Sequence, residues 1–239
     1  MQQFQRRPRL FYPFVALTLA FAILAIGVSV ANPLYESTDE IRHYRYVRIV
    51  ATEHRLPIQD QEQNRAQSHH PPLYYVISAL LTGWLPSPHD GDFQHPDNPF
   101  WGYRSFAPGV DNKLQYWHGP AEPFRDGHLA ALAARWVNVL FGIATLVVTY
   151  ALARQVFGTR KSTKAQVHPL RSSTSPELLA LAVTAIVALN PQFIYLSGAI
   201  NNDIVAALAG ASLLLMSVRL IKTGITPGAA ITLGIVSGL

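Results

Sequence analysis

The chain has 239 residues, of which 49% are hydrophobic and only 14% are charged, whereas soluble domains usually carry about 25% charged residues. The apolar residues form long blocks between polar stretches, a pattern typical of a polytopic membrane protein rather than of a soluble one. The absence of cysteine excludes disulfides and thiolate metal sites. The net charge of +5 does not indicate nucleic acid as a partner, because the basic residues cluster beside apolar runs, where they act as membrane-topology signals.

The first apolar run predicts a transmembrane helix at residues 10–31, after a basic N-terminus at residues 1–9 that we place in the cytoplasm. About 20 apolar residues cross a bilayer core of about 30 Å, and this uncharged run is long enough. A cleaved signal peptide is the alternative, because Ser29 and Ala31 form a small-x-small site. Signal-peptide apolar regions span only roughly 7–15 residues, so the run favours an uncleaved anchor.

Residues 32–127 form a polar segment rich in proline, histidine and aromatic residues, and we expect an extracytoplasmic loop that bears amphipathic helices. Ser37 and Glu40 match a capping box, followed by an amphipathic helix on the outer membrane surface with the stripe Ile41, Tyr44, Val47 and Val50 or Ala51. The apolar stretch from Leu73 to Leu85 is too short to span and predicts an interfacial, re-entrant or core helix. Residues 86–123 predict a long ordered loop or lid.

Further apolar runs predict four more membrane segments, at residues 128–153, 178–200, 201–221 with a turn at its start, and 225–239. A kink at Asn190-Pro191 is tolerable in a membrane helix, because neighbouring groups satisfy the freed carbonyl. The basic segment 154–177 is expected in the cytoplasm by the positive-inside rule, which places residues 32–127 on the opposite side. Since the last segment is incomplete, we expect the chain to be the N-terminal part of a longer protein.

Three polar clusters fall on the extracytoplasmic side of this map and are candidates for chemistry: Asp39 and Glu40 with Arg42 and His43, then His69 and His70, then Asn202 and Asp203. Sugar transfer from a lipid phosphate needs a base that takes the proton of the acceptor. It also needs cations that stabilise the departing phosphate. Asp39 or Glu40 can be the base, and the nearby arginines and histidines can be the cations.

Each cluster also has a purely structural explanation. Helix capping accounts for Glu40 and for the Asn201–Asp203 turn, and a solvated or Asp-paired interfacial position accounts for His43. The His69-His70 pair is equally compatible with a polar turn. Arg135, in the second apolar run, is explained by snorkelling of its side chain to the outer surface.

In their order along the chain these clusters resemble the polytopic GT-C glycosyltransferases. The similarity is to the protein-mannosyltransferase-like and aminoarabinose-transferase-like branch, which includes bacterial members of unassigned substrate. The residues that carry it are Asp39-Glu40 and the stretches "HHPPLYY", "ARWVNVLFGIATLVVTYALARQVFG" and "ALNPQFIYLSGAINND". The resemblance implies an all-α polytopic membrane protein with a GT-C-like helical bundle in a bacterial-type cytoplasmic membrane, its active face outside.

The resemblance also implies an activity, the transfer of a sugar from a polyprenyl-phosphate carrier to an acceptor. The acid of the first outer loop is then the base or an acceptor-binding carboxylate, and its position falls on Asp39 with Glu40 beside it. The expected substrate-binding residues are His43, Arg42, His69, His70, Tyr74, Asn202 and Asp203. The later membrane helices and C-terminal region of the family are absent from this sequence. Some phosphate-binding basic residues of relatives lie in such later regions, so we expect this chain to be inactive alone.

No cofactor follows from these residues. Carboxylates and histidines on the outer side permit a divalent cation, but no spacing demands one. The expected partners are the lipid bilayer, a polyprenyl-phosphate-linked sugar and an unknown acceptor, without nucleic acid. The alternatives are a non-catalytic polytopic protein, such as an assembly subunit or a binding or transport component, and an inactive relative. A transporter would carry polar groups or broken helices near the membrane midplane, and only Asn190-Pro191 comes close.

Overall fold

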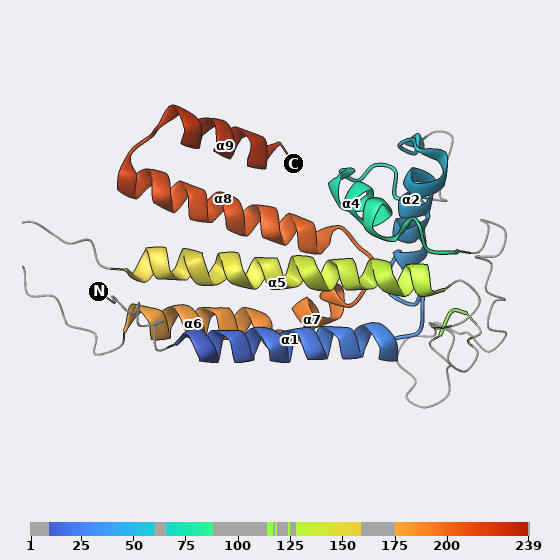
Figure 1. Ribbon diagram of the computed structural model, residues 1–239, viewed down its shortest axis with the longest axis horizontal. Coiled ribbons are helices and arrows are strands. Elements are labelled where there is room, and N and C mark those ends of the chain that lie inside the picture. The colour runs from blue at the N-terminus through green and yellow to red at the C-terminus, as the bar shows by residue number, and fades with distance from the viewer. Residues whose placement is uncertain are drawn as a thin grey trace, which may run out of the picture. The chain divides into compact units, whose positions relative to one another are not determined.

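The fold is known from a computed structural model, which describes residues 10–59, 66–87, 114–116, 118, 124, 128–158 and 175–238. The regular secondary structure of these residues is entirely α-helical, without strands (Figure 1). The helices are α1 (Phe11–Ala31), α2 (Glu40–Glu53), α4 (Leu73–Thr82), α5 (Leu129–Phe157), α6 (Pro176–Ala188), α7 (Pro191–Ser197), α8 (Asp203–Thr223) and α9 (Pro227–Ser237). The prediction of an all-α protein is therefore confirmed. Residues 1–9 and most of the predicted segments 86–123 and 154–177 lie outside the described residues.

Three of these helices, α1, α5 and α8, are long and apolar enough to cross a membrane. The pair α6 and α7 passes the same test together but is bent by 65°, so it is either a broken span or a re-entrant loop. α4 and α9 are apolar but shorter. Three or four candidate spans fit a multi-pass membrane protein.

The bend between α6 and α7 is larger than the kink that the sequence suggested. Pro191 begins a new helix, a position where its fixed φ and missing N–H cost nothing. The Asn190 side chain caps that helix, because its Oδ1 accepts hydrogen bonds from the backbone N–H of Gln192 at 2.9 Å and of Phe193 at 3.3 Å. The stretch from Pro176 to Ser197 is thus two helices rather than one kinked helix.

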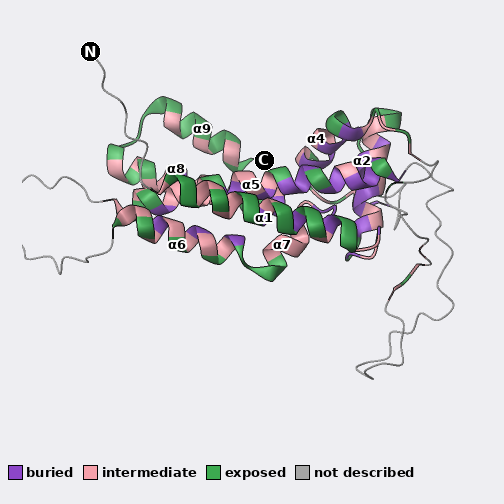
Figure 2. Ribbon diagram, turned by 60° about the horizontal axis from the view of Figure 1, so that its bottom comes forward, coloured by how far each residue is buried: buried purple, intermediate pink, exposed green. Residues whose placement is uncertain are grey.

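The chain divides into two compact units. The first comprises Met1–Ala25, Val139–Tyr195 and Asp203–Leu239, and the second comprises Ile26–Asn138 and Leu196–Asn202. In the first unit Phe21, Leu146 and Ala188 belong to one buried apolar cluster. Many outward side chains of the unit are apolar and exposed (Figure 2), as expected where lipid covers a helix.

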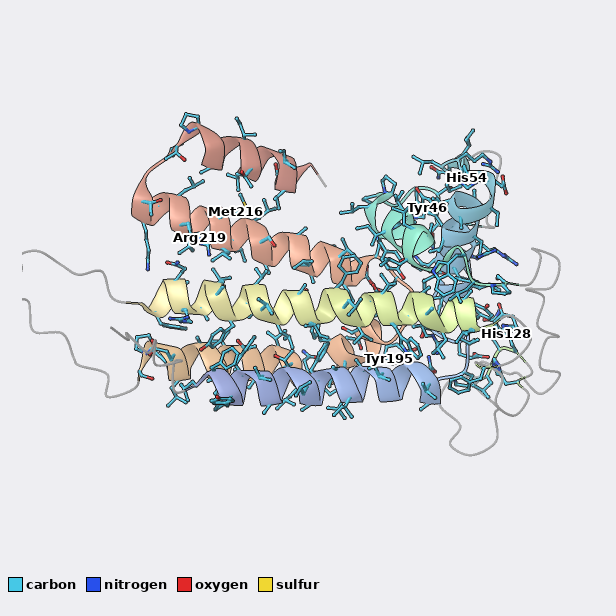
Figure 3. The ribbon with its side chains drawn as sticks, in the orientation of Figure 1. Tyr46, His54, His128, Tyr195, Met216 and Arg219 are labelled. Carbon is cyan, nitrogen blue, oxygen red and sulfur yellow. The ribbon has the colours of Figure 1, made fainter. Side chains whose placement is uncertain are left out.

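The second unit contains α2 and α4, which pack against each other (Figure 1), together with the end of α1 and the start of α5. Tyr46 of α2 lies between the two helices (Figure 3), and its ring stacks on the fully buried Tyr75 with 3.8 Å between centroids. A Cβ on Gly83 would lie 2.9 Å from the Cβ of Ala51, so the absence of a side chain permits this close approach.

The start of α4 at Leu73 agrees with the prediction. The buried face of α2 is wider than the predicted stripe. Tyr44 and Val47 are buried as expected, but Glu40, His43, Tyr46 and Ile49 are buried too. More than one neighbouring segment covers this helix, so a single apolar stripe does not describe it.

Candidate functional site

The centre of the second unit is an ion pair between Glu40, the first residue of α2, and Arg135 of α5. Both side chains are fully buried. The guanidinium binds the carboxylate through two parallel hydrogen bonds, from Nε to Oε1 at 2.7 Å and from Nη2 to Oε2 at 2.6 Å. This bidentate geometry is the strong form of an Arg–carboxylate interaction.

The remaining N–H groups of Arg135 donate to backbone carbonyls at the end of α1. Nη1 donates to Ser29 O at 2.7 Å and to Asn32 O at 2.6 Å, and Nη2 donates to Pro33 O at 2.9 Å. The last carbonyls of a helix lack partners within the helix, and a cation there is favourable. The interpretation of Arg135 as a snorkelling residue is therefore wrong, because its charge is fully used inside the protein.

The Glu40 carboxylate is equally saturated. Besides Arg135, Oε1 accepts the backbone N–H of Ile200 at 2.8 Å and Oε2 accepts the backbone N–H of Tyr35 at 3.0 Å. A carboxylate has about four lone-pair positions, and all four are occupied. Glu40 thus ties the end of α1, the start of α2, α5 and the 196–202 loop together, and it has no position left for the proton of an acceptor.

The predicted capping box is wrong. α2 begins at Glu40, and the residue before it, Asp39, makes no side-chain cap. The hydroxyl of Ser37 instead accepts a hydrogen bond from Asn32 Nδ2 at 2.9 Å. The physical reason is that a buried arginine binds a carboxylate far more strongly than an exposed backbone N–H does.

Asp39 has the opposite environment to its neighbour. Its side chain is 43% exposed and pairs with Arg42 at 3.3 Å. Its backbone is in the left-handed region, with φ 56° and ψ 10°, a conformation that is uncommon for residues other than glycine and easier for Asp than for most. Since Glu40 is anchored on one side, this conformation holds an accessible carboxylate at the helix start.

Predicted substrate-binding histidines from two segments meet at His43, whose backbone N–H donates to the carbonyl of Asp39 at 3.0 Å. The rings of His43 and His70 are 5.3 Å apart between centroids, and those of His69 and His70 are 4.3 Å apart. The backbone N–H of Gln67 donates to the carbonyl of Arg42 at 3.3 Å and so links the segments. The structure therefore gathers Asp39, Arg42, His43, His69 and His70 in one unit.

His43 is buried, and its Nδ1 lies 2.7 Å from the hydroxyl of Tyr75. Burial lowers the pKa of His43 to about 4, His70 and His69 add to this lowering, and Asp39 opposes it. His43 is thus neutral at neutral pH, so its role is that of a hydrogen-bonding group rather than of a cation.

We expect His43 to make the protein less stable in mild acid. Its pKa falls from 6.5 in the unfolded chain to about 4 in the folded one, so protons favour unfolding as the pH drops from 6.5 toward 4. The total effect is roughly 3 kcal/mol. Melting temperatures in detergent across this range should show the decline for the wild type and a flatter curve for His43→Gln. Equal slopes for both proteins would contradict it.

The other predicted site residues have different places. Tyr74 is buried, and its hydroxyl donates to Ala134 O at 3.4 Å. Asn202 is half-buried in the second unit, whereas Asp203 begins α8 in the first unit and is exposed. The structure thus gives Tyr74 a packing contact, and it assigns the two turn residues to different units.

The segment 196–202, which links α7 to α8, is held by Asn138, a residue for which the sequence indicated no role. Asn138 of α5 is fully buried, and its Nδ2 donates to Ala199 O at 2.6 Å and to Asn201 O at 2.9 Å. The side chain of Asn201 in turn donates to Leu196 O at 2.8 Å. These bonds fix the backbone that presents the N–H of Ile200 to Glu40.

Glu36 is a second residue that the sequence did not single out. Its side chain is 8% exposed. Oε2 accepts the backbone N–H of Gln115 at 2.9 Å, and Oε1 accepts both the N–H of Tyr116 at 2.9 Å and Nε2 of His118 at 2.7 Å. These partners lie 79 to 82 residues further along the chain, so no local pattern could reveal them.

Within the ranges that the structure describes, no group of three or more His, Cys, Asp or Glu side chains is arranged to hold a metal ion. The histidines beside Asp39 are joined by ring contacts and by the Tyr75 hydroxyl.

Comparison of the chain with protein-family models, with curated proteins and with solved structures finds no match.

Proposed function

We propose that the protein is a membrane glycosyltransferase, which moves a sugar from a polyprenyl-phosphate carrier to an acceptor on the extracytoplasmic face. The observation that supports it most is the contrast between two adjacent acids. Glu40 is buried and saturated by Arg135, whereas Asp39 is 43% exposed and held in a left-handed conformation. Residues in uncommon backbone conformations cluster at functional sites, where the surrounding structure maintains them.

In this proposal Asp39 takes the proton of the acceptor group. The deprotonated acceptor atom attacks the anomeric carbon of the sugar, the bond from that carbon to the phosphate oxygen breaks, and polyprenyl phosphate leaves. A base contributes about 10²–10⁴-fold to such a step when it lies within hydrogen-bond reach of the proton. Glu40 is a positioning residue here, because it anchors the helix start and touches no substrate.

Arg42 and the histidines fit the other half of the reaction. Arg42 Nη1 lies 3.3 Å from Asp39 Oδ1, and the Arg42 side chain is 43% exposed. Its guanidinium can therefore bind the donor phosphate close to Asp39, the proposed base. Arg is suited to this role by its fixed fork of donors. The exposed His69 and the half-buried His70 supply hydrogen-bonding and stacking surface for the sugar, and the buried His43 packs against the ring of His70. Asn202 and Asp203 remain proposed substrate-binding residues.

The proposal is tested by donor turnover. The full-length protein in phospholipid vesicles is incubated with radiolabelled polyprenyl-phosphate hexoses and pentoses and with a cell-envelope extract as acceptor source. We expect release of polyprenyl phosphate together with transfer of the label to an acceptor, for one donor of the panel. Tight donor binding without any release would overturn glycosyl transfer and would favour a non-catalytic binding or transport component.

A further inference from the structure

An apolar groove lies between the C-terminal halves of α2 and α4, away from Asp39 along α2. Its volume is about 480 Å³, and it is lined by Val50, Ala51, His54, Arg55, Leu56, Val76, Ala79, Leu80 and Gly83. His54 marks the end of α2 at which the groove lies (Figure 3).

Exposed large apolar side chains either line this groove, as Leu56 and Leu80 do, or follow one of its lining residues within two positions of the chain. Leu80 is 76% exposed, Trp84 is 77% exposed, and Leu56 is 50% exposed, with Ile58 and Leu81 exposed beside them. Single exposed apolar residues are ordinary, but a contiguous patch marks an interaction surface. These five residues, with the groove, form what we term the α2–α4 apolar surface.

The chemistry of this surface fits the boundary between lipid tails and headgroups. The indole N–H of Trp84 donates to Leu81 O at 2.9 Å, so the polar atom is satisfied and the exposed ring is free to enter an apolar phase. Tryptophan is enriched at this depth of a membrane. Arg55 lines the groove and holds its charged end in an exposed pair with Glu53 at 2.6 Å between Nη2 and Oε2, an arrangement that suits the polar headgroup layer beside an apolar surface.

We propose that the α2–α4 apolar surface inserts into the interfacial layer of the bilayer that the protein spans. The compact unit that carries this surface also contains the end of α1 and the start of α5, which are two of the candidate spans. The surface therefore belongs to the same compact unit as parts of two candidate spans. Since those spans would bring the unit to the membrane, lipid is the occupant that we assign to the surface.

This contact goes beyond glycosyl transfer and does not require it. It fixes α2 at headgroup depth, because the C-terminal half of the helix is then held by lipid while its first residue is held by Arg135. Asp39 and the histidines would face molecules that are themselves anchored in the bilayer. A protein without transferase activity could use the same contact to orient its outer loop.

Site-directed spin labelling tests the contact, and the natural absence of cysteine makes single labels simple. The label is placed at Leu80→Cys in the 239-residue chain, reconstituted in vesicles of phosphatidylcholine and phosphatidylglycerol. We expect the label to collide more often with oxygen, which concentrates in lipid, than with a water-soluble nickel chelate. The same labelled protein is also measured in a mild detergent, without a bilayer. There we expect no spin–spin broadening, because broadening would mean that the labels of two copies of the chain lie close together.

A label at Thr52→Cys is the matched control. Thr52 is exposed on the same helix pair, and at 100° per residue it lies on the side of α2 opposite the groove residues Val50, Ala51 and His54. It should collide more often with the nickel chelate. Nickel-chelate access at Leu80→Cys equal to that at Thr52→Cys would overturn lipid contact. Spin–spin broadening at Leu80→Cys alone would also overturn it, by assigning the surface to a second copy of the chain.

Discussion

Replacing Arg135 with alanine is expected to destabilise the protein by about 3–5 kcal/mol, because the variant leaves Glu40 buried without a partner. The loss is not limited to the ion pair. The guanidinium also satisfies the carbonyls of Ser29, Asn32 and Pro33, and a buried polar group without a hydrogen bond costs about 1–3 kcal/mol. Thermal unfolding in detergent micelles, followed by circular dichroism, measures the effect.

The matched control is Trp136→Phe, one residue further along α5. Trp136 donates a single hydrogen bond to Ser29 Oγ at 3.1 Å, so its loss should cost only about 0.5–1.5 kcal/mol. Arg135→Lys should resemble Arg135→Ala, because an ammonium has three donors and cannot reproduce the fork that meets all five acceptor positions. A melting temperature for Arg135→Ala equal to that of Trp136→Phe would show that the buried pair does not hold this unit together.

The double variant Arg135→Met with Glu40→Leu distinguishes the stability contributed by the ion pair itself from that contributed by the hydrogen bonds of the two side chains to backbone groups. Apolar replacement of a buried ion pair is often neutral or stabilising. Here it would also orphan three carbonyls at the end of α1 and the backbone N–H groups of Tyr35 and Ile200. The double variant should therefore remain clearly less stable than the wild type. Wild-type stability would mean that these backbone groups find other partners at no cost.

Asp39→Asn is expected to lower the rate of sugar transfer by about 10²–10⁴-fold, the usual contribution of a general base. The amide keeps the size of the side chain but cannot take a proton. Asn also tolerates the left-handed backbone conformation that Asp39 adopts. The exposed pair with Arg42 is worth at most about 1 kcal/mol, so stability should change little. Turnover of a radiolabelled polyprenyl-phosphate sugar in vesicles measures the rate.

Two further variants exclude a purely structural role of Asp39. Asp39→Gly keeps the left-handed conformation, because glycine adopts it without strain, and it should be as inactive as Asp39→Asn. Glu40→Gln should lose stability, since Gln cannot provide a charged partner for Arg135. Wild-type turnover in Asp39→Asn or Asp39→Gly would eliminate Asp39 as the base. Asp39 would also be eliminated as the base if the turnover of these two variants fell only in proportion to their folded fraction.

Local sequence pattern was sufficient for the positions of the three long apolar helices α1, α5 and α8. The apolar run after residue 9 becomes α1, and the short apolar stretch after Pro72 becomes α4 from Leu73 onward. These features depend on hydrophobicity and on helix periodicity within one segment, which neighbouring residues alone encode. The same reasoning placed a break near Pro191, but it did not foresee that the break would bend the segment by 65°, because the bend depends on how Asn190 caps the next helix.

Local pattern was insufficient for the polar side chains. Ser37 and Glu40 have the spacing of a capping box, yet Glu40 binds Arg135, 95 residues away, and the N–H of Ile200, 160 residues away. Arg135 has the position of a snorkelling residue, yet it is fully buried. By itself the sequence determined an all-helical chain with candidate membrane spans, and with most of its acids and histidines between the first two of them. Only the tertiary structure decided which acid is buried and which is exposed, because an ion pair in a low-dielectric interior outweighs every local capping preference.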